Sequence, residues 1–335
     1  MPAYDVLHPA YRVALGPAPC AVDLGDGSER GEYVNQDYIL RALGRPHRSI
    51  NLMYCYFPRD QGWPRRASEA FPPSAEFAWA YPYDDYFPYQ GGPGGNPAGE
   101  PFRQIREIRR HGQDATLTLT IDCGLDDGYL RAIARELAPF GRLRLRVNHE
   151  CDGDWFACNK RFSRSAISSF FIRFAGIIRE EAPLVRTICC FGTVDPATGR
   201  LRHEDELVPM LRHADIWSVD KYLSLHYAWP FNICEKDQLN RGYTHAGPDE
   251  VWRELHRIYE IFVERSGQEK PLEICEFNAD GDVGGAIQQA RELREFYDRV
   301  RTERPPFLKG LTYYQFRDRG RLGLEREDPN NPAVG

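Results

Sequence analysis

The apolar and polar positions from residue 115 onward alternate between two periods. Runs of β-branched and apolar residues, typical of buried strands, are followed by segments whose apolar residues recur at helical spacing. The expected strands cover residues 115–122, 143–147, 185–191, 216–223, 272–277 and 308–316, with a helix expected in each interval. Asp126 and Asp127 are placed to cap the first of these helices, and Pro139 and Gly141 to end it.

The N-terminal part of the chain continues the same rhythm. A helix is expected to end at Leu43, before Gly44 and Pro46, and a strand covers residues 49–57. A first strand must lie within residues 11–24, where the pattern is weak. Eight strand–helix units favour a closed parallel barrel, and no GxGxxG or P-loop follows any strand. We therefore predict an α/β fold, a single (β/α)₈ TIM barrel over residues 1–335.

Residues 59–113 interrupt this rhythm after the second strand. Many Pro and Gly occur in this segment, and residues 63–89 hold nine aromatic residues, namely Trp63, Phe71, Phe77, Trp79, Tyr81, Tyr83, Tyr86, Phe87 and Tyr89. Disordered segments are poor in aromatics, and long loops in compact domains are often functional. We expect an ordered insertion at the C-terminal face of the barrel, where active sites lie. The sequence leaves open which rings pack on the barrel and which face a ligand.

Composition and charge narrow the classes of partner. The chain is 42% hydrophobic and 27% charged, which excludes a disordered protein, and its formal net charge is −6. Without a basic run or a long apolar stretch, neither nucleic acid nor a membrane is an expected partner. No signal peptide is visible, so a cytoplasmic location is expected, or secretion if a leader was lost. Aromatic residues reach 13%, which indicates either a heavy core or stacking surfaces for sugars.

The nine cysteines form no CxxC pair, and their number is odd. We expect reduced thiols, although Cys151 and Cys158 are close enough in sequence to bridge a short loop. The histidines do not cluster at the spacing of metal ligands, so no metal and no cofactor is predicted.

Two carboxylates occupy matching positions at strand ends. Glu150 follows the fourth expected strand, and Glu276 closes the seventh. Parallel strand ends converge on the mouth of a barrel, so the two side chains can meet there. Retaining glycosidases use such a pair. One carboxyl group is protonated and donates its proton to the leaving oxygen, and the other is ionised and attacks the anomeric carbon. A single strand-end Glu is more often an ion-pair or cap residue, so the pair carries the prediction.

The segment 127–156 resembles glycoside hydrolase family 26. The matching positions of its strand-four motif are Arg146, His149, Glu150, Gly153, Trp155 and Phe156. The resemblance extends over roughly residues 35–317 and implies a (β/α)₈ retaining glycosidase of the same clan. It assigns Glu150 as acid/base on strand four, Glu276 as nucleophile on strand seven, and Tyr222 as a partner of the nucleophile. Cys151, Asp152 and Lys221 depart from the family pattern, as do the ends of strands five and eight, which leaves the sugar open.

Several neighbours complete the expected site. Arg146 lies one pleat deeper than the strand end and is expected to bond Glu276 and keep it ionised. His149 can hold the acid/base or a sugar hydroxyl, and Trp155 offers a flat face to a pyranose. Asp122 can bond a sugar or cap the next helix. Further candidates for substrate binding are Tyr56, Asp220, Tyr222, Lys221 and, more weakly, Gln315 and Asp318.

The predicted function is a retaining β-glycosidase that acts on a β-linked oligosaccharide or polysaccharide. One alternative is a non-catalytic carbohydrate-binding barrel, and another is a clan-related glycosidase of a different substrate class. A barrel enzyme of other chemistry, such as a lyase or metal-dependent hydrolase, requires metal ligands or a strand-end lysine base. Lys221 is the only such lysine. The sugar, endo or exo action and the oligomeric state stay open.

Overall fold

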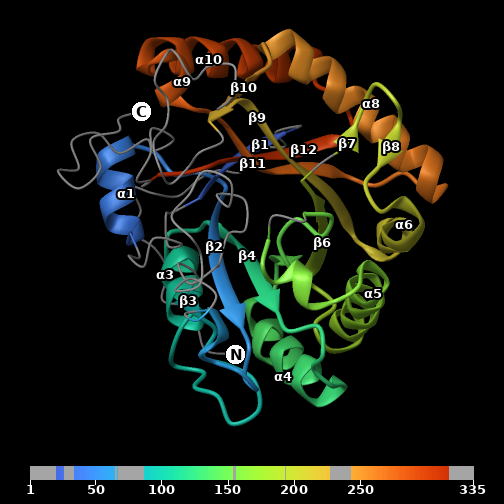
Figure 1. Ribbon diagram of the computed structural model, residues 1–335. Helices are drawn as coiled ribbons and strands as arrows, with labels where there is room; N and C mark the ends of the chain where they lie inside the picture. The colour runs from blue at the N-terminus through green and yellow to red at the C-terminus, as the bar shows by residue number, and fades with distance from the viewer. Residues whose placement is uncertain are drawn as a thin grey trace.

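The chain forms a closed barrel of parallel strands. The computed structural model describes residues 20–25, 34–64, 66, 87–153, 156–192, 194–226 and 243–316. Within these ranges the barrel consists of β1 (Ala21–Gly25), β2 (Ser49–Tyr56), β4 (Asp114–Ile121), β5 (Leu143–Val147), β6 (Arg186–Phe191), β9 (Ile216–His226), β11 (Leu272–Ala279) and β12 (Leu308–Tyr313). Each pairs in parallel with the next, and β1 pairs with both β12 and β2, which closes the barrel (Figure 1). The predicted (β/α)₈ barrel is confirmed.

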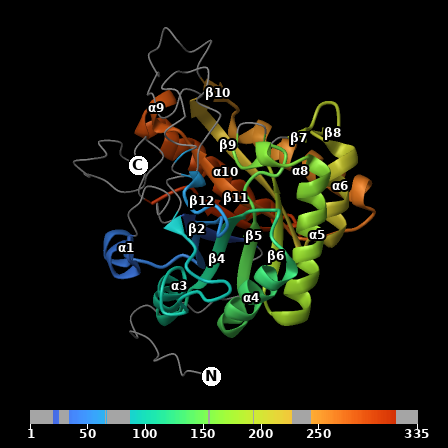
Figure 2. The ribbon, with the colours of Figure 1, turned by 60° about the horizontal axis from the view of Figure 1, so that its bottom comes forward.

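Helices surround the barrel (Figures 1 and 2). The main ones are α1 (Gln36–Leu43), α3 (Phe102–Arg110), α4 (Asp127–Leu137), α5 (Arg164–Glu181), α6 (Glu204–His213), α8 (Pro248–Ser266) and α10 (Ala286–Glu303). Their ends follow the local chemistry of the sequence. The side chain of Asp126 accepts a hydrogen bond from the Gly128 amide at the start of α4, as predicted. Gly44 ends α1 in the left-handed conformation, with φ +71°.

Shorter elements lie between these units. They are β3 (Phe87–Pro88), η4 (Ala138–Phe140), η5 (Asn159–Arg161), β7 (Val194–Asp195), β8 (Arg200–Leu201), β10 (Tyr243–His245) and α9 (Gly281–Gly284). The β7–β8 pair is a small antiparallel sheet of its own, and β10 pairs antiparallel with β9.

The segment 59–113 is only partly an insertion. Its last part is α3, which was not predicted and which packs between β2 and β4 as a barrel helix, because Phe102, Ile105 and Ile108 are buried on one face. Tyr89 packs edge-on against Tyr56 and Phe102. These contacts fasten the end of the segment to the outside of the barrel. Six of the aromatic residues lie outside the described residues, namely Phe71, Phe77, Trp79, Tyr81, Tyr83 and Tyr86.

The strands bury apolar side chains outward against the helices and many polar ones inward. On β4, Leu117 and Leu119 belong to the large cluster shared with the helices. Thr118 lies between them, and its hydroxyl donates to Asn51 Oδ1 of the neighbouring strand β2 at 3.1 Å. A polar interior allows the barrel to hold charged side chains along its axis.

Two further expectations concern a disulfide between Cys151 and Cys158 and membrane-spanning helices. Cys151 and Cys158 are both free thiols, so no bridge closes that loop. None of the helices in the described ranges combines the length and apolarity needed to cross a bilayer.

Candidate active site

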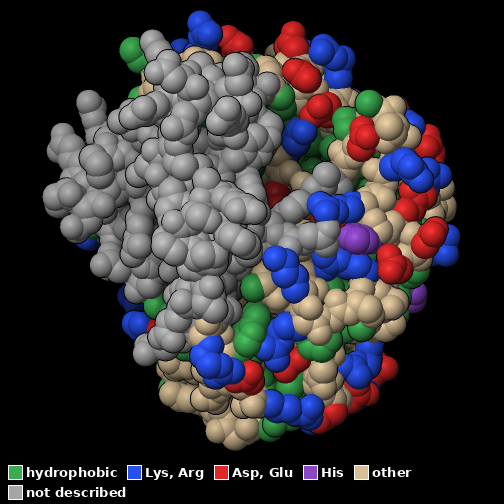
Figure 3. Space-filling model, viewed as in Figure 1, with side chains coloured by type: hydrophobic (Ala, Val, Ile, Leu, Met, Phe, Trp, Pro, Cys, Tyr) green, Lys and Arg blue, Asp and Glu red, His purple; other side chains and the backbone are tan. Residues whose placement is uncertain are grey.

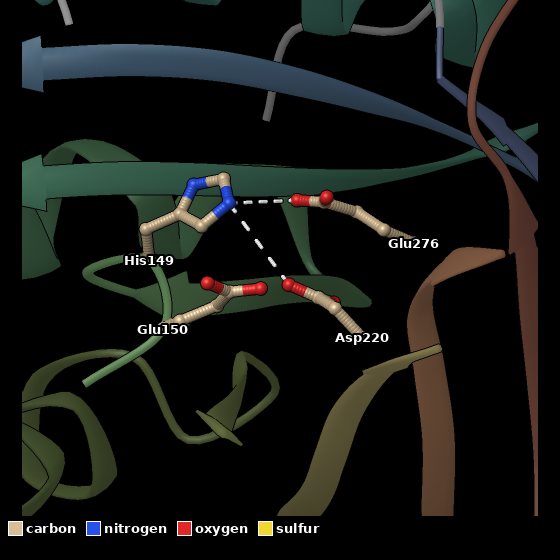
Figure 4. Close-up of side chains that lie close together, drawn as sticks. All are labelled: His149, Glu150, Asp220 and Glu276. Atoms are coloured by element: carbon tan, nitrogen blue, oxygen red, sulfur yellow. Dashed lines mark ion pairs between the residues drawn. The ribbon is translucent and has the colours of Figure 1, made fainter. Parts of the chain in front are cut away.

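Four acidic or basic side chains meet at the C-terminal ends of three barrel strands. His149 and Glu150 follow β5, Asp220 belongs to β9 and Glu276 to β11. One ligating atom from each lies within 4.8 Å of the others. In Figure 4 the imidazole of His149 points to Glu276, and the carboxyl groups of Glu150 and Asp220 face each other. The convergence expected for Glu150 and Glu276 is therefore present.

Arg146 of β5 contacts two acids of this cluster from deeper in the barrel. Its side chain is completely buried, and Nη1 donates to Glu276 Oε1 at 2.8 Å. Nη2 forms an ion pair with Asp220 and also donates to the Cys190 sulfur at 3.2 Å. The predicted contact between Arg146 and Glu276 is thus observed. The same guanidinium holds both carboxylates in place, as the planar fork of arginine permits.

Glu276 is held in its ionised form. His149 Nε2 lies 2.8 Å from Glu276 Oε1, and the Tyr222 hydroxyl donates to Oε2 at 3.0 Å. Burial alone raises the pKa of this carboxyl, but His149 and Arg146 outweigh burial and hold the pKa well below its usual range. Burial and Arg146 lower the pKa of His149 to about 4, so the imidazole is neutral and donates through Nε2. His149 therefore serves Glu276 rather than Glu150.

A bulge in β11 turns Glu276 toward the axis. Leu272 and Ile274 face outward into the cluster shared with the helices, so strict alternation would direct Glu276 outward as well. In the pairing with β9, Ile274 is opposite Val219 and Glu276 is opposite Asp220, which leaves Cys275 as the extra residue. The additional residue reverses the alternation, as bulges beside active sites do.

The loop after β5 places Glu150. Asn148 has φ 58°, in the left-handed region, and its side chain accepts from the Ile121 amide at 2.9 Å. Asn159 Nδ2 donates to the Glu150 carbonyl oxygen at 2.6 Å. The carboxyl group lies against Gly192, where an added Cβ would be 2.4 Å from Glu150 Cδ. Only glycine leaves room for the acid at this point of the wall.

Glu150 is held in its protonated form. Burial raises its pKa well above the usual range, and the charges of Asp220 and Glu276 act in the same direction. Glu150 and Asp220 are also joined by a side-chain hydrogen bond. Burial raises the pKa of Asp220 to about 7 against the opposing effect of Arg146. The pair therefore shares one proton that resides on Glu150, while Asp220 accepts it as a hydrogen bond.

The donor set of this cluster also resembles a metal site, because His149, Glu150, Asp220 and Glu276 offer ligands of suitable types. In this structure, however, Arg146 supplies the positive charge inside the cluster and directs its protons at both Asp220 and Glu276. His149 uses Nε2 for Glu276 as well. The carboxylates are thus satisfied by protein donors, and we assign no metal or cofactor to the site.

Two predicted substrate-binding residues face away from the site. Tyr56 lies on the outer side of β2, where its ring contacts Tyr89 and Tyr129. Lys221 follows the inward Asp220 on β9, so it points outward and pairs with Glu254 of α8. Both side chains point away from the carboxylate cluster because neighbouring residues of a strand point to opposite faces.

Of the other candidates, the structure describes Asp122 and Gln315. Asp122 neither caps α4 nor contacts these acids; its Oδ1 accepts from the Gly124 amide at 3.0 Å in a local turn. Gln315 is buried beside Gly25, two residues after the end of β12. Trp155 and Asp318 lie outside the described residues.

An apolar wall beside the carboxylates was not predicted as a unit. Its buried members are Met53, Cys55, Phe57, Phe156, Cys158 and Tyr314, and the partly exposed Trp63 and Tyr222 pack against them. The Phe156 ring lies 4.6 Å from that of His149. Met53 and Cys55 on β2 and Phe57 just after it occupy alternate positions, but the residues between them are also apolar or aromatic, so the sequence did not show which face points inward. Figure 3 shows a hollow near the centre of the described surface, with an acidic side chain inside it and Lys and Arg side chains nearby.

Comparison with known proteins supports the fold without extending it to a family. No protein-family profile and no curated protein sequence matches this chain. A modular endo-β-1,4-mannanase of glycoside hydrolase family 26 from Cellulomonas fimi is similar in structure, with a TM-score of 0.53 and 14% identity over 92% of this chain and 68% of that one. Cel5A of Thermotoga maritima, solved with mannotriose, gives 0.54 and 14% over 92% and 94%. A family 39 glycoside hydrolase from Bacteroides cellulosilyticus gives 0.51 and 13% over 94% and 59%.

Proposed function

We propose that this protein is a retaining β-glycosidase, with Glu276 as nucleophile and Glu150 as acid/base. The observation that carries the proposal is the opposite protonation of two buried carboxyls in one cluster. Donors surround Glu276 and favour its charge, whereas Glu150 has acidic neighbours that favour its proton. Retaining glycosidases require this division of roles across a short separation. The resemblance to family 26 and the similar barrels of glycoside hydrolases support the same assignment.

In the first step, a Glu276 oxygen attacks the anomeric carbon of a β-linked sugar while Glu150 donates its proton to the departing glycosidic oxygen. The bond to the leaving group breaks, and a covalent glycosyl ester forms on Glu276. Arg146, His149 and Tyr222 position the nucleophile, because together they contact both of its oxygens.

In the second step, Glu150 is a carboxylate beside the ionised Asp220. This like-charge contact makes Glu150 a strong base, so it takes a proton from water as the water oxygen attacks the anomeric carbon. The ester bond to Glu276 breaks, and the sugar leaves with its original anomeric configuration. Both carboxyl groups return to their starting protonation states.

The first experiment replaces the nucleophile. Glu276→Gln should remove turnover of a panel of aryl β-glycosides and β-linked oligosaccharides, because the amide cannot form the ester. Glu273→Gln is the matched control, since Glu273 lies on the same strand but pairs with Arg144 and Arg48. Full activity in Glu276→Gln would refute the assigned nucleophile. A wild-type protein that binds these sugars but hydrolyses none would indicate a carbohydrate-binding barrel instead.

The second experiment separates the acid from the nucleophile. Glu150→Gln should slow substrates with alkoxide leaving groups by roughly 10²–10⁴-fold, the usual range for general acid catalysis. Aryl glycosides with activated leaving groups should lose much less in the first step, because those groups depart without a proton. Equal losses on both substrate types would contradict this role. NMR of the first product should show retained configuration, and an inverted product would exclude the mechanism.

A further inference from the structure

We propose that the apolar wall beside the nucleophile ends in a subsite for an acidic sugar, formed by Phe57, Trp63 and Arg161. We call these three residues the Arg161 platform. The inference rests on the proposed glycosidase function and names its substrate class, a β-linked glycan that carries a hexuronic acid carboxylate. The catalytic residues themselves play no part in this recognition.

The platform is continuous with the active site. Tyr222 donates to Glu276, and the same ring packs against the apolar wall that also includes Phe57. Trp63 packs on this wall as well, with its ring 4.6 Å from that of Phe57. Tyr222 and Trp63 are the partly exposed members of the wall. A saccharide bound at Glu276 can therefore extend over an aromatic surface toward Trp63, as sugars use flat apolar faces.

Arg161 is held at the end of that surface by its rings. Its guanidinium carbon lies 4.5 Å from the centroid of Trp63 and 5.6 Å from that of Phe57. The loop that carries it is tied to the acid/base, because Asn159, two residues earlier, bonds the carbonyl oxygens of Glu150 and Gly153 at 2.6 and 2.9 Å. The guanidinium is thus fixed relative to Glu150 before any ligand binds.

The charge of Arg161 is only loosely compensated. Its Nη1 lies 3.8 Å from Asp60 Oδ2, beyond hydrogen-bond range, and Asp60 Oδ1 accepts from Arg66 at 2.5 Å. Within the described ranges no oxygen accepts a hydrogen bond from this guanidinium. Its side chain is 27% exposed, so part of it stays accessible to a ligand. A planar edge with parallel N–H groups matches a carboxylate in two-point contact.

The test compares acidic glycans with their carboxyl-reduced forms, in which each uronic acid becomes the corresponding neutral sugar. Glucuronoxylan and polymannuronate serve as the two probes. The wild-type protein should hydrolyse at least one acidic form with a higher kcat/KM than its reduced form. Arg161→Ala should lower kcat/KM on that acidic glycan about tenfold or more and leave the reduced form within twofold.

Control variants separate recognition from folding and from general charge. Arg161→Lys should retain part of the preference and Arg161→Gln very little, although the planar amide of Gln can still stack on Trp63. Lys160→Ala removes an exposed neighbouring charge and should change neither substrate. Equal losses on acidic and reduced glycans, or an acidic preference that survives Arg161→Ala, would overturn the subsite.

A binding measurement distinguishes failure of the subsite from failure of the proposed function. Calorimetry in the Glu276→Gln background should detect acidic oligosaccharides of both probes and weaker binding after Arg161→Ala. If no glycan is hydrolysed but this Arg161-dependent binding persists, the subsite stands and the glycosidase proposal fails. If acidic and reduced oligosaccharides bind alike, or if neither binds, the subsite is wrong.

Discussion

Two ionic networks lie inside the same barrel and share one strand. Arg146 supports the mouth, while Arg144, two residues earlier on β5, belongs to a floor network with Asp23, Arg48 and Glu273. Arg144 Nη1 lies 2.9 Å from Asp23 Oδ2 and 2.8 Å from Glu273 Oε2. Arg48 pairs with the same two acids. The floor network thus sets two cations against two carboxylates.

The mouth lacks this balance. Among the described residues, a single guanidinium faces Glu276 and Asp220 there, and Glu150 adds a third carboxyl. On the floor, Arg144 and Arg48 overcome burial and lower the pKa of Asp23. At the mouth, burial together with the excess of acid raises the pKa of Glu150 instead. The same strand therefore contributes to a balanced ion network at one end. At the other end it lies beside a stored proton, which the proposed acid catalysis uses.

The largest difference is expected from exchanging the two arginines for lysine. Arg146→Lys cannot bond Glu276 and Asp220 together, so kcat/KM on an aryl glycoside should fall roughly 10²-fold, as for other preorganised donors. Arg144→Lys should keep kcat/KM within twofold but lower the Tm, because it loses contacts to Asp23 and Glu273. Steady-state kinetics and thermal unfolding measure both. Comparable losses of activity in the two variants would remove the functional distinction between the networks.

Each network lies against one glycine of the barrel wall, so the two glycines offer a second matched pair of substitutions. Gly192→Ala places a Cβ 2.4 Å from Glu150 Cδ, so the acid must move, and kcat/KM on poor leaving groups should fall roughly tenfold or more. Gly310→Ala places a Cβ 2.6 Å from Arg48 Nη2 and 3.0 Å from Glu273 Cδ. This should cost about 1–3 kcal/mol of stability with little change in kcat/KM. Unchanged kinetics in Gly192→Ala would show that Glu150 tolerates displacement.

Stability should respond to pH in opposite ways at the two ends. The raised pKa of Glu150 means that the folded state loses stability as pH rises from the usual glutamate range through this pKa. Glu150→Gln removes that loss. The Tm of the variant minus that of the wild type should therefore increase by roughly 2 °C between pH 5 and pH 8.

Asp23 supplies the converse measurement. Its lowered pKa contributes stability above the unfolded pKa, and this contribution is lost as pH falls through the folded value. Asp23→Asn should therefore lower the Tm at pH 7, and the difference from wild type should shrink toward pH 3. Parallel pH trends in Asp23→Asn and Glu150→Gln would contradict the contrast between floor and mouth.

The smallest effect is expected at Cys190, whose thiol donates to Asp220 Oδ1 at 3.4 Å and lowers the pKa of that acid. Cys190→Ala removes this donor, so the pair of Glu150 and Asp220 should hold its shared proton to higher pH. The alkaline limb of the kcat/KM profile should move upward by a few tenths of a pH unit, the size expected for a weak hydrogen bond. Cys190→Ser keeps a donor and should restore the limb. A downward shift in Cys190→Ala would contradict this contact.

Seven of the eight barrel strands could be placed from the sequence, and β1 only within a wider range, 11–24, but the facing of individual side chains often could not be read. Residues 49–56 are apolar or aromatic at most positions, so their pattern does not separate the two faces. Tyr56 was predicted to bind substrate and lies outside, whereas Cys55 and Phe57 face the mouth. The helix α3 was missed because its apolar positions fall within the long segment that interrupts the repeat.

By itself, the sequence determined the eight-strand repeat, the helix caps and the strand-end positions of Glu150 and Glu276, because periodicity and capping depend on neighbouring residues in the chain. Only the tertiary structure decided that Glu276 faces inward, since the bulge at Cys275 exists through pairing with β9. It also decided which carboxyl keeps a proton. Burial, the charge of Arg146 and the closeness of Asp220 set these pKa values, and all three arise when distant strands close the barrel.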